Sequence, residues 1–459
     1  MKKLLLFLTI FISLNSFSQN EFNYWFFGNY NGLDFTSGTP VVIGGSIMTQ
    51  TEGVAAISDA GGNLLFYTNG INVYNRNNVI MPNGSGLLGD ASSTQSSIII
   101  KKPLSSSIYY IFTADVDIGP DGIRWNEVDM TLNAGLGAVT ANKNILLQTP
   151  SCEKLCAVRH CNGRDIWVIS HDWNSNTFRA WLVDDISVGA TVVWSNAGSV
   201  VNGISQSGYG QLKASSDGTR LGTCYYGYGN STGINKVEVY DFDKATGVVS
   251  NAITLSTTEI GPYGFEFSKT GRFVYAATNQ GRLNQWDLCA PNILASKYLV
   301  QNTGPFIGSL QMANNGKIYV SRGTQPILSA INNPEVAGVG CGFVTTAVNL
   351  TSSAMFGLPN FPAYYNEPTL FPITANQTDC NTFCFSYPPP ILSCNEVMPT
   401  FQWSFSDGTV QFGLNVCKTF PTNTNNEDVL LEIIQPCRID SIFININVGS
   451  NFDTIITIN

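Results

Sequence analysis

A pattern of three short apolar runs separated by turns recurs along the chain, and it constrains the fold more than any other feature. One copy, "FEFSKTGRFVYAATNQGRLNQWDL", covers residues 265–288. Five similar copies begin at Val54, Ser96, Leu155, Gln211 and Ser309. The glycines of successive turns are 55, 53 and 45 residues apart, at Gly163, Gly218, Gly271 and Gly316. A period of about 50 residues with several strands per copy predicts a β-propeller.

The expected number of blades depends on the two ends of the repeat region. A seventh copy can be assembled from "YWFFGNYNGLDFTSGTPVVI" at residues 24–43, which supplies three runs, and "FGLPNFPAYY" at residues 356–365, which supplies one. Joining these segments leaves no open sheet edge at the seam, where a free edge invites aggregation. We therefore predict an all-β chain whose residues 20–366 form a seven-bladed β-propeller closed by N- and C-terminal strands. A six-bladed ring is the alternative.

The composition agrees with a β-rich fold and excludes one class of partner. Only 12% of the residues are charged, against about a quarter in typical soluble domains. Aromatic residues are plentiful, and Asn, Ser, Thr and Gly fill the polar positions, which favours strands joined by tight turns. The net charge is −9 and no basic stripe is present. A nucleic-acid partner is therefore excluded.

The N-terminus has the pattern of a secretory signal peptide. In "MKKLLLFLTIFISLNSFSQ", residues 1–19, two lysines precede an apolar stretch and then small and polar residues. The apolar stretch is short for a membrane span, and no later segment is apolar for 18 residues. We expect cleavage near residues 18–20 and a secreted or cell-surface protein with no transmembrane segment in the mature chain.

The composition and the apolar pattern of the sequence change after the repeats. "NEPTLFPITANQTDC" is rich in Pro and Asn and predicts a linker over residues 367–378. Alternating runs such as "TFQWSFSDGTVQF" and "DSIFININV" then predict a small β-sandwich over residues 379–459. The chain has 11 cysteines, an odd number. Disulfides are expected in the sandwich, with the pairing left open, among Cys380, Cys384, Cys394, Cys417 and Cys437.

Several stretches resemble a group of uncharacterised exported β-propeller proteins of gliding and related Gram-negative bacteria. The likeness rests on "YWFFGNYNGLDF", "TEGVAAISDAGGNLLFYTNG", "MPNGSGLLGDASSTQSSII", "EKLCAVRH", "SHDWNSNTF" and "FGLPNFPAYY". It implies a C-terminal domain of the polycystic-kidney-disease (PKD) type, with an Ig-like fold, and export by type IX secretion. "WSFSDG" at residues 403–408 is similar to the W-x-F-G-D-G of PKD domains, with Ser406 in place of the usual Gly. We recognise no type IX sorting signal after residue 450.

Two glutamates are the candidates for chemistry at the propeller axis. Glu52 and Glu153 each precede the first run of a copy, and equivalent positions of neighbouring blades converge near the axis of a propeller. Paired carboxylates at a channel mouth can act as acid and base in a glycosidase. They can equally be strand-end residues bonded to backbone. The sequence contains only two histidines and no nucleophile motif, so we expect binding rather than catalysis.

Two further clusters contain residue types that can bind metal ions, and only the first of them is a candidate site. Asp115, Asp117 and Asp121 in "DVDIGPDG" alternate as oxygen ligands of Ca²⁺ do, although Gly119 stands where a third ligand belongs. A solvated hairpin loop is the alternative, and calcium is the one cofactor that the sequence leaves open. "CEKLCAVRHC", from residue 152 to residue 161, is predicted to be a strand, whose side chains are too far apart for one zinc ion. We interpret its cysteines as small apolar core residues.

Loop aromatics are the candidate binding residues. Trp125, Trp173, Tyr226 and Tyr228 can stack on sugars or peptides, or can pack between sheets as aromatic residues often do. Because propellers display loops at two rigid ends, we expect an exported, cell-surface-associated binding or adhesion module that recognises a surface protein or a glycan. A carbohydrate-active or other hydrolase that uses the central channel is the runner-up. A structural spacer in a larger adhesin is the third hypothesis.

Overall fold

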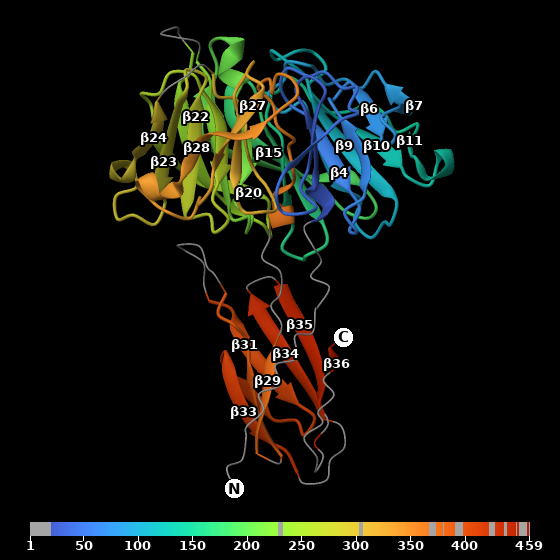
Figure 1. The fold of residues 1–459 in the computed structure, drawn as a ribbon, viewed down its shortest axis with the longest axis vertical. Coiled ribbons are helices and arrows are strands. Elements are labelled where there is room, and N and C mark those ends of the chain that lie inside the picture. Colours follow the sequence, from blue (N-terminus) through green and yellow to red (C-terminus); the bar gives the residue numbers. More distant parts are fainter. Residues whose placement is uncertain are drawn as a thin grey trace. The chain divides into compact units, whose positions relative to one another are not determined.

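The computed structural model describes residues 20–227, 233–302, 306–366, 373–379, 381–390, 398–421, 427–435, 438–446, 448 and 457–458 (Figure 1). Within them the chain is all-β, with short 3₁₀ turns and no α-helix. None of its described helices is long and apolar enough to cross a membrane. The chain divides into two compact units, one built from residues 20–366 and the other from the described residues after 372.

The first unit contains seven antiparallel sheets, each made of strands that follow one another in the chain. The first three sheets are β1 (Tyr24–Phe27), β2 (Asn31–Asp34) and β3 (Val41–Ile43); β4 (Ala55–Ser58), β5 (Leu64–Thr68), β6 (Asn72–Asn75) and β7 (Ile80–Ser85); and β8 (Ser97–Lys101), β9 (Ile108–Ala114), β10 (Ile123–Asp129), β11 (Ala138–Val139) and β12 (Ile145–Gln148).

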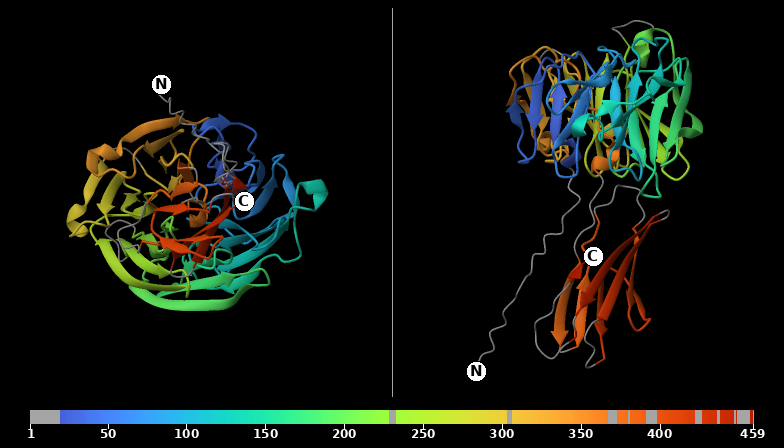
Figure 2. Two further views of the ribbon diagram at one scale, coloured as in Figure 1. Left: turned by 90° about the horizontal axis from the view of Figure 1, so that it is seen from below. Right: turned by 90° about the vertical axis from the view of Figure 1, so that its right-hand side faces the viewer.

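The other four sheets have four strands each. They are β13 (Cys156–Arg159), β14 (Ile166–His171), β15 (Ser175–Val183) and β16 (Val188–Val201); β17 (Leu212–Ala214), β18 (Arg220–Tyr225), β19 (Lys236–Asp243) and β20 (Val248–Ser256); β21 (Pro262–Phe267), β22 (Phe273–Thr278), β23 (Arg282–Asp287) and β24 (Tyr298–Asn302); and β25 (Leu310–Met312), β26 (Ile318–Ser321), β27 (Ile327–Ile331) and β28 (Phe343–Asn349). The sheets lie around a common centre, as in a β-propeller (Figure 2, left).

Short 3₁₀ turns join some of these strands. They are η1 (Asn20–Phe22), η2 (Asn133–Gly135), η3 (Ser205–Gly208), η4 (Leu294–Ser296), η5 (Gly338–Cys341) and η6 (Ala363–Asn366).

Both faces of the middle strands are buried, which explains their apolar runs. Every residue of β14 and of β22 is buried. One apolar cluster joins Ile57 and Phe66 of the second sheet to Ile99 and Ile111 of the third. Similar clusters join later pairs of sheets. Each sheet is therefore stabilised by packing on its neighbours, as the repeat predicted.

The two ends of the first unit meet. Trp25 of β1 and Leu358 lie in one apolar cluster, and the ring centroids of Trp25 and Phe361 are 6.0 Å apart. The backbone N–H of Asn29 donates to the carbonyl of Ser353 at 3.1 Å. These contacts join segments that the sequence analysis expected to share one sheet.

The C-terminal end of this unit differs from the expected fourth strand. It forms no continuous strand, and its one β-bridge joins Pro359 in parallel to Val54, at the start of β4. Asn360 also donates its N–H to the carbonyl of Val54 at 2.8 Å. Pro359 and Pro362 have no N–H to donate, so a ladder cannot run through this segment.

The outermost strands protect their edges without charge. β3, β7, β12, β16, β20, β24 and β28 contain no charged residue. Six of them pair with their inner neighbour through an irregular register, and the seventh, β3, has only three residues. Bulges and short strands discourage edge-to-edge pairing. Irregular register and short strand length therefore limit edge-to-edge pairing here, as charged residues do on many other sheet edges.

The second unit consists of two sheets that share one apolar core. The strands are β29 (Thr374–Asp379), β30 (Thr382–Ser386) and β33 (Asn415–Thr419) in one sheet, and β31 (Thr400–Phe405), β32 (Val410–Phe412), β34 (Glu427–Gln435), β35 (Arg438–Ile446) and β36 (Thr457–Ile458) in the other. Trp403 is fully buried in this core. β29 lies mostly within the segment that the sequence predicted as linker, because its polar residues belong to an edge strand that shows no apolar alternation.

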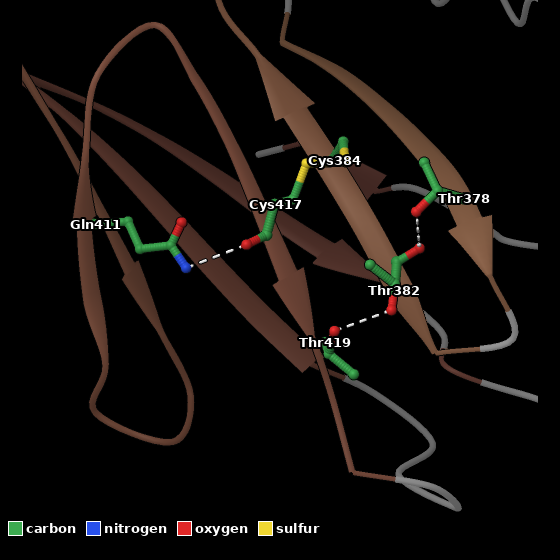
Figure 3. Close-up of a disulfide and its surroundings, with 6 residues drawn as sticks. All are labelled: Thr378, Thr382, Cys384, Gln411, Cys417 and Thr419. Atoms are coloured by element: carbon green, nitrogen blue, oxygen red, sulfur yellow. Dashed lines mark hydrogen bonds between the residues drawn. A yellow bond between two sulfur atoms is a disulfide. The ribbon is translucent and has the colours of Figure 1, made fainter.

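One disulfide crosses the smaller sheet. Cys384 and Cys417 are directly opposed in β30 and β33 and are bonded to each other (Figure 3). A hydrogen bond of 2.9 Å between the hydroxyls of Thr382 and Thr419 lies beside them. The pairing adds a covalent link to a short edge strand. The other candidates, Cys380, Cys394 and Cys437, lie outside the described residues.

The meeting of the two ends makes a stability prediction. Trp25 is fully buried and contacts Phe35 and Tyr319 as well as Phe361. We expect Trp25→Ala to lower the free energy of unfolding by about 3–5 kcal/mol. The matched control, Trp194→Ala, removes a side chain that is 62% exposed and should change it by about 0.5 kcal/mol or less. Urea unfolding followed by circular dichroism measures both, and equal effects would contradict the role of the seam.

Candidate binding site at the start of the inner strands

The candidate site lies where the inner strands of the first unit begin. β4, β8, β13, β17 and β21 are the first strands of successive sheets. The residues that precede or open them are Glu52, Thr94, Glu153, Tyr209 and Tyr263. Hydrogen bonds and ring contacts connect these residues, which come from five different sheets. We call this group, together with Asp117, Tyr226, Phe306 and Phe356, the axial mouth.

Glu153 is a buried residue that organises its neighbours. It is 1% exposed, and one carboxylate oxygen accepts the backbone N–H of Thr94 at 2.7 Å and its hydroxyl at 3.0 Å. The other oxygen accepts the backbone N–H of Asp117 at 2.9 Å. Glu153 therefore holds two segments from the neighbouring sheet, which agrees with the hypothesis of a strand-end glutamate bonded to backbone.

Glu52 is the more accessible carboxylate of the pair. It is partly exposed and accepts a hydrogen bond of 2.8 Å from the Tyr263 hydroxyl. The hydroxyl of Thr94 interacts with Glu52 as well as with Glu153, so the two carboxylates approach the same side chain. The structure thus brings together the two glutamates that the sequence singled out.

Burial makes both carboxylates hold protons more tightly than usual. It raises the pKa of Glu52 to about 7 against the opposing effect of the Tyr263 hydrogen bond. Burial, reinforced by the charge of Glu52, raises the pKa of Glu153 to about 8. The cause is desolvation together with like charge, since both disfavour a second negative charge in the site. Near neutral pH the pair can therefore hold or release a proton.

The loop that contains Asp117 is strained. Asp117 and Ile118 have φ values of 52° and 63°, and a β-branched residue such as Ile rarely adopts the left-handed region. Such residues cost about 1–3 kcal/mol each and concentrate at functional sites. The Asp117 carboxylate accepts hydrogen bonds from the hydroxyls of Ser205 and Tyr209. The hydrogen bond that the Asp117 N–H donates to Glu153 therefore fixes an exposed carboxylate beside Tyr209.

The three aspartates proposed for calcium do not converge. The Asp115 carboxylate accepts the backbone N–H groups of Val116 and Asp121 at 2.8 and 3.0 Å. Asp121 pairs with Arg124 at 3.0 Å, while Asp117 contacts Tyr209 instead. In the described part of the chain, no group of three His, Cys, Asp or Glu side chains could hold a metal ion. The loop has the contacts of a hairpin braced by its own backbone.

A chain of aromatic rings runs through the axial mouth, and two of its members, Tyr209 and Tyr263, donate hydrogen bonds to Asp117 and Glu52. Tyr209 stacks on Tyr226 with centroids 5.9 Å apart, and Tyr226 meets Tyr263 at 6.4 Å. Tyr263 meets Phe356 at 6.4 Å, and Phe356 meets Phe306 at 6.0 Å. Phe306 is 47% exposed, whereas Tyr263 is 5% exposed. The chain therefore has one exposed ring, that of Phe306, and partly exposed rings at Tyr209 and Phe356, while Tyr226 and Tyr263 are buried.

A buried lysine supports the segment that carries Tyr209. The Lys154 ammonium donates to the carbonyls of Tyr209, Gly210 and Cys224 at 2.9, 2.7 and 2.7 Å. Burial lowers its pKa to about 8. All three donor positions of the ammonium are used inside the protein, so Lys154 positions the backbone of the mouth and is not available to a ligand.

Only one of the aromatic residues proposed from sequence belongs to the mouth. Tyr226 does, and Tyr228 lies outside the described residues. Trp125 meets the ring of Tyr110 at 5.4 Å and packs in the apolar cluster between two sheets. Trp173 packs against the cluster of Cys152, Val201 and Tyr225. Neither makes a ring contact with the aromatic chain of the mouth, because each faces a space between sheets.

Sequence reasoning missed Tyr209, Tyr263, Phe306 and Phe356. Tyr209 and Tyr263 stand just before an inner strand or near its start, as Glu52 and Glu153 do. Comparing this position across all copies, instead of selecting glutamates alone, would have found both tyrosines. Phe306 and Phe356 lie in irregular segments, where no repeat marks them.

Buried amides lie behind the mouth. The Gln95 side chain donates to the carbonyls of Leu155 and Leu212 and accepts their N–H groups. It also contacts the Asn360 side chain at 3.2 Å. These hydrogen bonds join inner strands of different sheets and occupy space near their centre. A ligand would therefore engage the mouth and not this buried layer.

The cysteines near the mouth behave as core residues. Cys152 and Cys156 belong to different apolar clusters and are buried. Burial raises the pKa of the Cys152 thiol to about 12, so it stays protonated although its sulfur lies 3.8 Å from Nδ1 of His171. The His160 ring is tilted against that of Trp167, with ring centroids 5.7 Å apart. This placement agrees with the interpretation that the cysteines fill the core.

The paired glutamates make a prediction about pH. A folded-state pKa above the unfolded value near 4.3 means that the folded protein binds more protons, so stability falls as pH rises between these values. We expect the pair to contribute a loss of stability from pH 5 to pH 8. Glu52→Gln should reduce that loss by on the order of 1 kcal/mol, because it removes one carboxylate and its repulsion of Glu153.

Urea unfolding at both pH values measures this difference. Glu335→Gln is the control, since Glu335 is an exposed carboxylate that accepts hydrogen bonds from Thr270 elsewhere in the same unit. It should leave the pH dependence of wild type unchanged. A Glu52→Gln profile parallel to that of wild type would show that the glutamates do not interact as described.

Comparison with known proteins finds likeness among solved structures only. No protein-family model and no curated protein matches the chain. Among solved structures, the periplasmic gluconolactonase PpgL of Pseudomonas aeruginosa is similar at 11% identity and a TM-score of 0.35, over 76% of this chain and 99% of that one. The β-propeller domain of Cps50 (Swd1) from Myceliophteria thermophila is similar at 11% identity and a TM-score of 0.33, over 78% of this chain and 97% of that one. The Dos1 propeller is similar at 14% identity and a TM-score of 0.38, over 65% of this chain and 73% of that one. The likeness is to β-propellers as a fold and carries no activity across.

Proposed function

We propose that the protein is an exported, cell-surface-associated binding module that recognises a surface protein or a glycan at the axial mouth. In this proposal residues 20–366 form a seven-bladed propeller closed by its two ends, and the second unit is a PKD-like sandwich. Support for closure comes from the contacts of Trp25, Asn29 and Val54 with residues 353–361.

The observation that carries the proposal is the junction of carboxylates and aromatic rings. Glu52 is partly exposed and Asp117 is exposed, while the side chains beside them include the partly exposed Tyr209 and the exposed Phe306. Carboxylate oxygens accept hydrogen bonds from sugar hydroxyls or peptide N–H groups, and ring faces stack on apolar faces of the same ligands. The strained backbone at Asp117 adds support, since strain of this kind collects at functional sites.

Binding is favoured over hydrolysis by the state of Glu153. A hydrolytic pair needs both carboxyl groups to reach the substrate. Glu153 is 1% exposed and its oxygens accept three donors from the protein. Its role in this proposal is to hold Thr94 and Asp117. Hydrolysis by Glu52 and Glu153 is the second candidate, and it is supported by the raised pKa values of the pair.

A binding screen of the mature chain against glycans and surface proteins, with and without Ca²⁺, tests the proposal. For any ligand found, we expect Tyr209→Ala to weaken binding about tenfold or more, because a stacked ring contributes about 1–3 kcal/mol beside a hydrogen-bonding site. Tyr298→Ala is the control, since Tyr298 is a comparably exposed tyrosine (38%) on β24, at the outer rim. Equal effects of the two variants would place the binding surface elsewhere.

The same ligand separates binding from hydrolysis. If the protein is a binding module, the ligand is recovered intact after long incubation. Cleavage that is lost in both Glu52→Gln and Glu153→Gln, with binding retained, would establish the hydrolase instead.

A further inference from the structure

A groove of about 550 Å³ lies at the outer part of the seam, away from the axial mouth. It separates the hairpin of β2 and β3 from the sheet that contains β26, β27 and β28. Its walls are formed by Thr39, Pro40, Val42, Lys317, Tyr319, Ala330, Asn332, Val344, Thr346, Ala347, Val348 and Asn349. A cavity of this size lies within the range of small-molecule sites.

The groove exists because the two outer strands differ in length. β3 has three residues, whereas the facing sheet ends in β28, which has seven. Residues 344–347 of β28 are all exposed. Val344, Thr346 and Val348 line the groove together with Ala347 and Asn349 of the same strand, whose pairing with β27 is irregular between Leu328 and Ala330. The short β3 does not cover these residues, so a space stays open between the sheets.

The lining combines an apolar wall with a cation. Val42, Val344 and Val348 supply aliphatic surface, and Val344 is 40% exposed. Lys317 is partly exposed, and among the described residues its ammonium has no hydrogen-bond or ion-pair partner. The Tyr319 hydroxyl accepts a hydrogen bond of 3.0 Å from Asn315, which leaves its own proton to donate. No carboxylate lines the groove.

We propose that this groove binds a small organic anion with an apolar body, such as a medium-chain carboxylate. The carboxylate would pair with Lys317, and the alkyl part would lie along Val42, Val344 and Val348. Charge complementarity selects the anion, because the groove holds one lysine and no acidic residue. An ammonium ligand would meet an uncompensated like charge there. The site is separate from the axial mouth and does not depend on the function proposed for it.

Titration calorimetry of the mature chain with sodium decanoate, below its micelle concentration, tests the proposal. We expect saturable binding with one site per chain. Decyltrimethylammonium, which has the same alkyl length and the opposite charge, should bind at least tenfold more weakly. Equal binding of the two probes, or no saturable binding of decanoate, would overturn the proposal.

Two pairs of variants locate the ligand. Thr346→Trp fills the groove and should abolish binding of decanoate, whereas Thr345→Trp, at an exposed residue of the same strand that does not line the groove, should leave binding unchanged. Lys317→Gln should weaken binding of decanoate at least tenfold, and Lys269→Gln, at an exposed lysine outside the groove, should not.

Each outcome decides a separate point. Binding that survives Thr346→Trp would overturn the site. Binding that is lost in Thr346→Trp but unaffected by Lys317→Gln would overturn the anionic class of the ligand. Circular dichroism confirms that each variant is folded before titration.

Discussion

Face-to-face packing of the sheets is the constraint on which the rest of the first unit depends. A sheet with two apolar faces is stable in water only when both faces are covered. Clusters such as the one joining Ile57 to Ile111 provide this cover between consecutive sheets. At the ends of the repeat the same requirement is met by Trp25 and Leu358, which lie in one cluster although they are far apart in sequence. The candidate site and the groove both depend on this arrangement.

The axial mouth arises because the repeated sheets bring equivalent positions together, while the residue types at those positions differ between copies. Each copy brings a residue at or just before the start of its inner strand to the same place, so Glu52, Glu153 and Tyr263 interact although they belong to different sheets. Divergence at that position then supplies a carboxylate in some copies and a ring in others. Glu153 is buried to hold the strained backbone at Asp117, while Glu52 stays accessible. Desolvation raises the pKa of both carboxyl groups.

The outer rim shows how a chain with few charges protects its sheet edges. The outermost strands carry no charged residue, yet their pairing is interrupted by bulges or ends after a few residues. The shortest of them, β3, also leaves the face of β28 uncovered. Protection of an edge and formation of the groove that Lys317 lines therefore have the same structural origin.

By itself the sequence determined the all-β class, the recurring sheet motif and the place of Glu52 and Glu153 just before inner strands, because periodic apolar runs and turn glycines are local signals. It also indicated that residues 24–43 and 356–365 belong together. Only the tertiary structure decided that Pro359 bridges Val54 and forms no regular strand, that Trp125 is packed between sheets, and that Asp117 turns toward Tyr209. These outcomes depend on which side chains meet across different sheets, and no local pattern in the chain specifies such meetings.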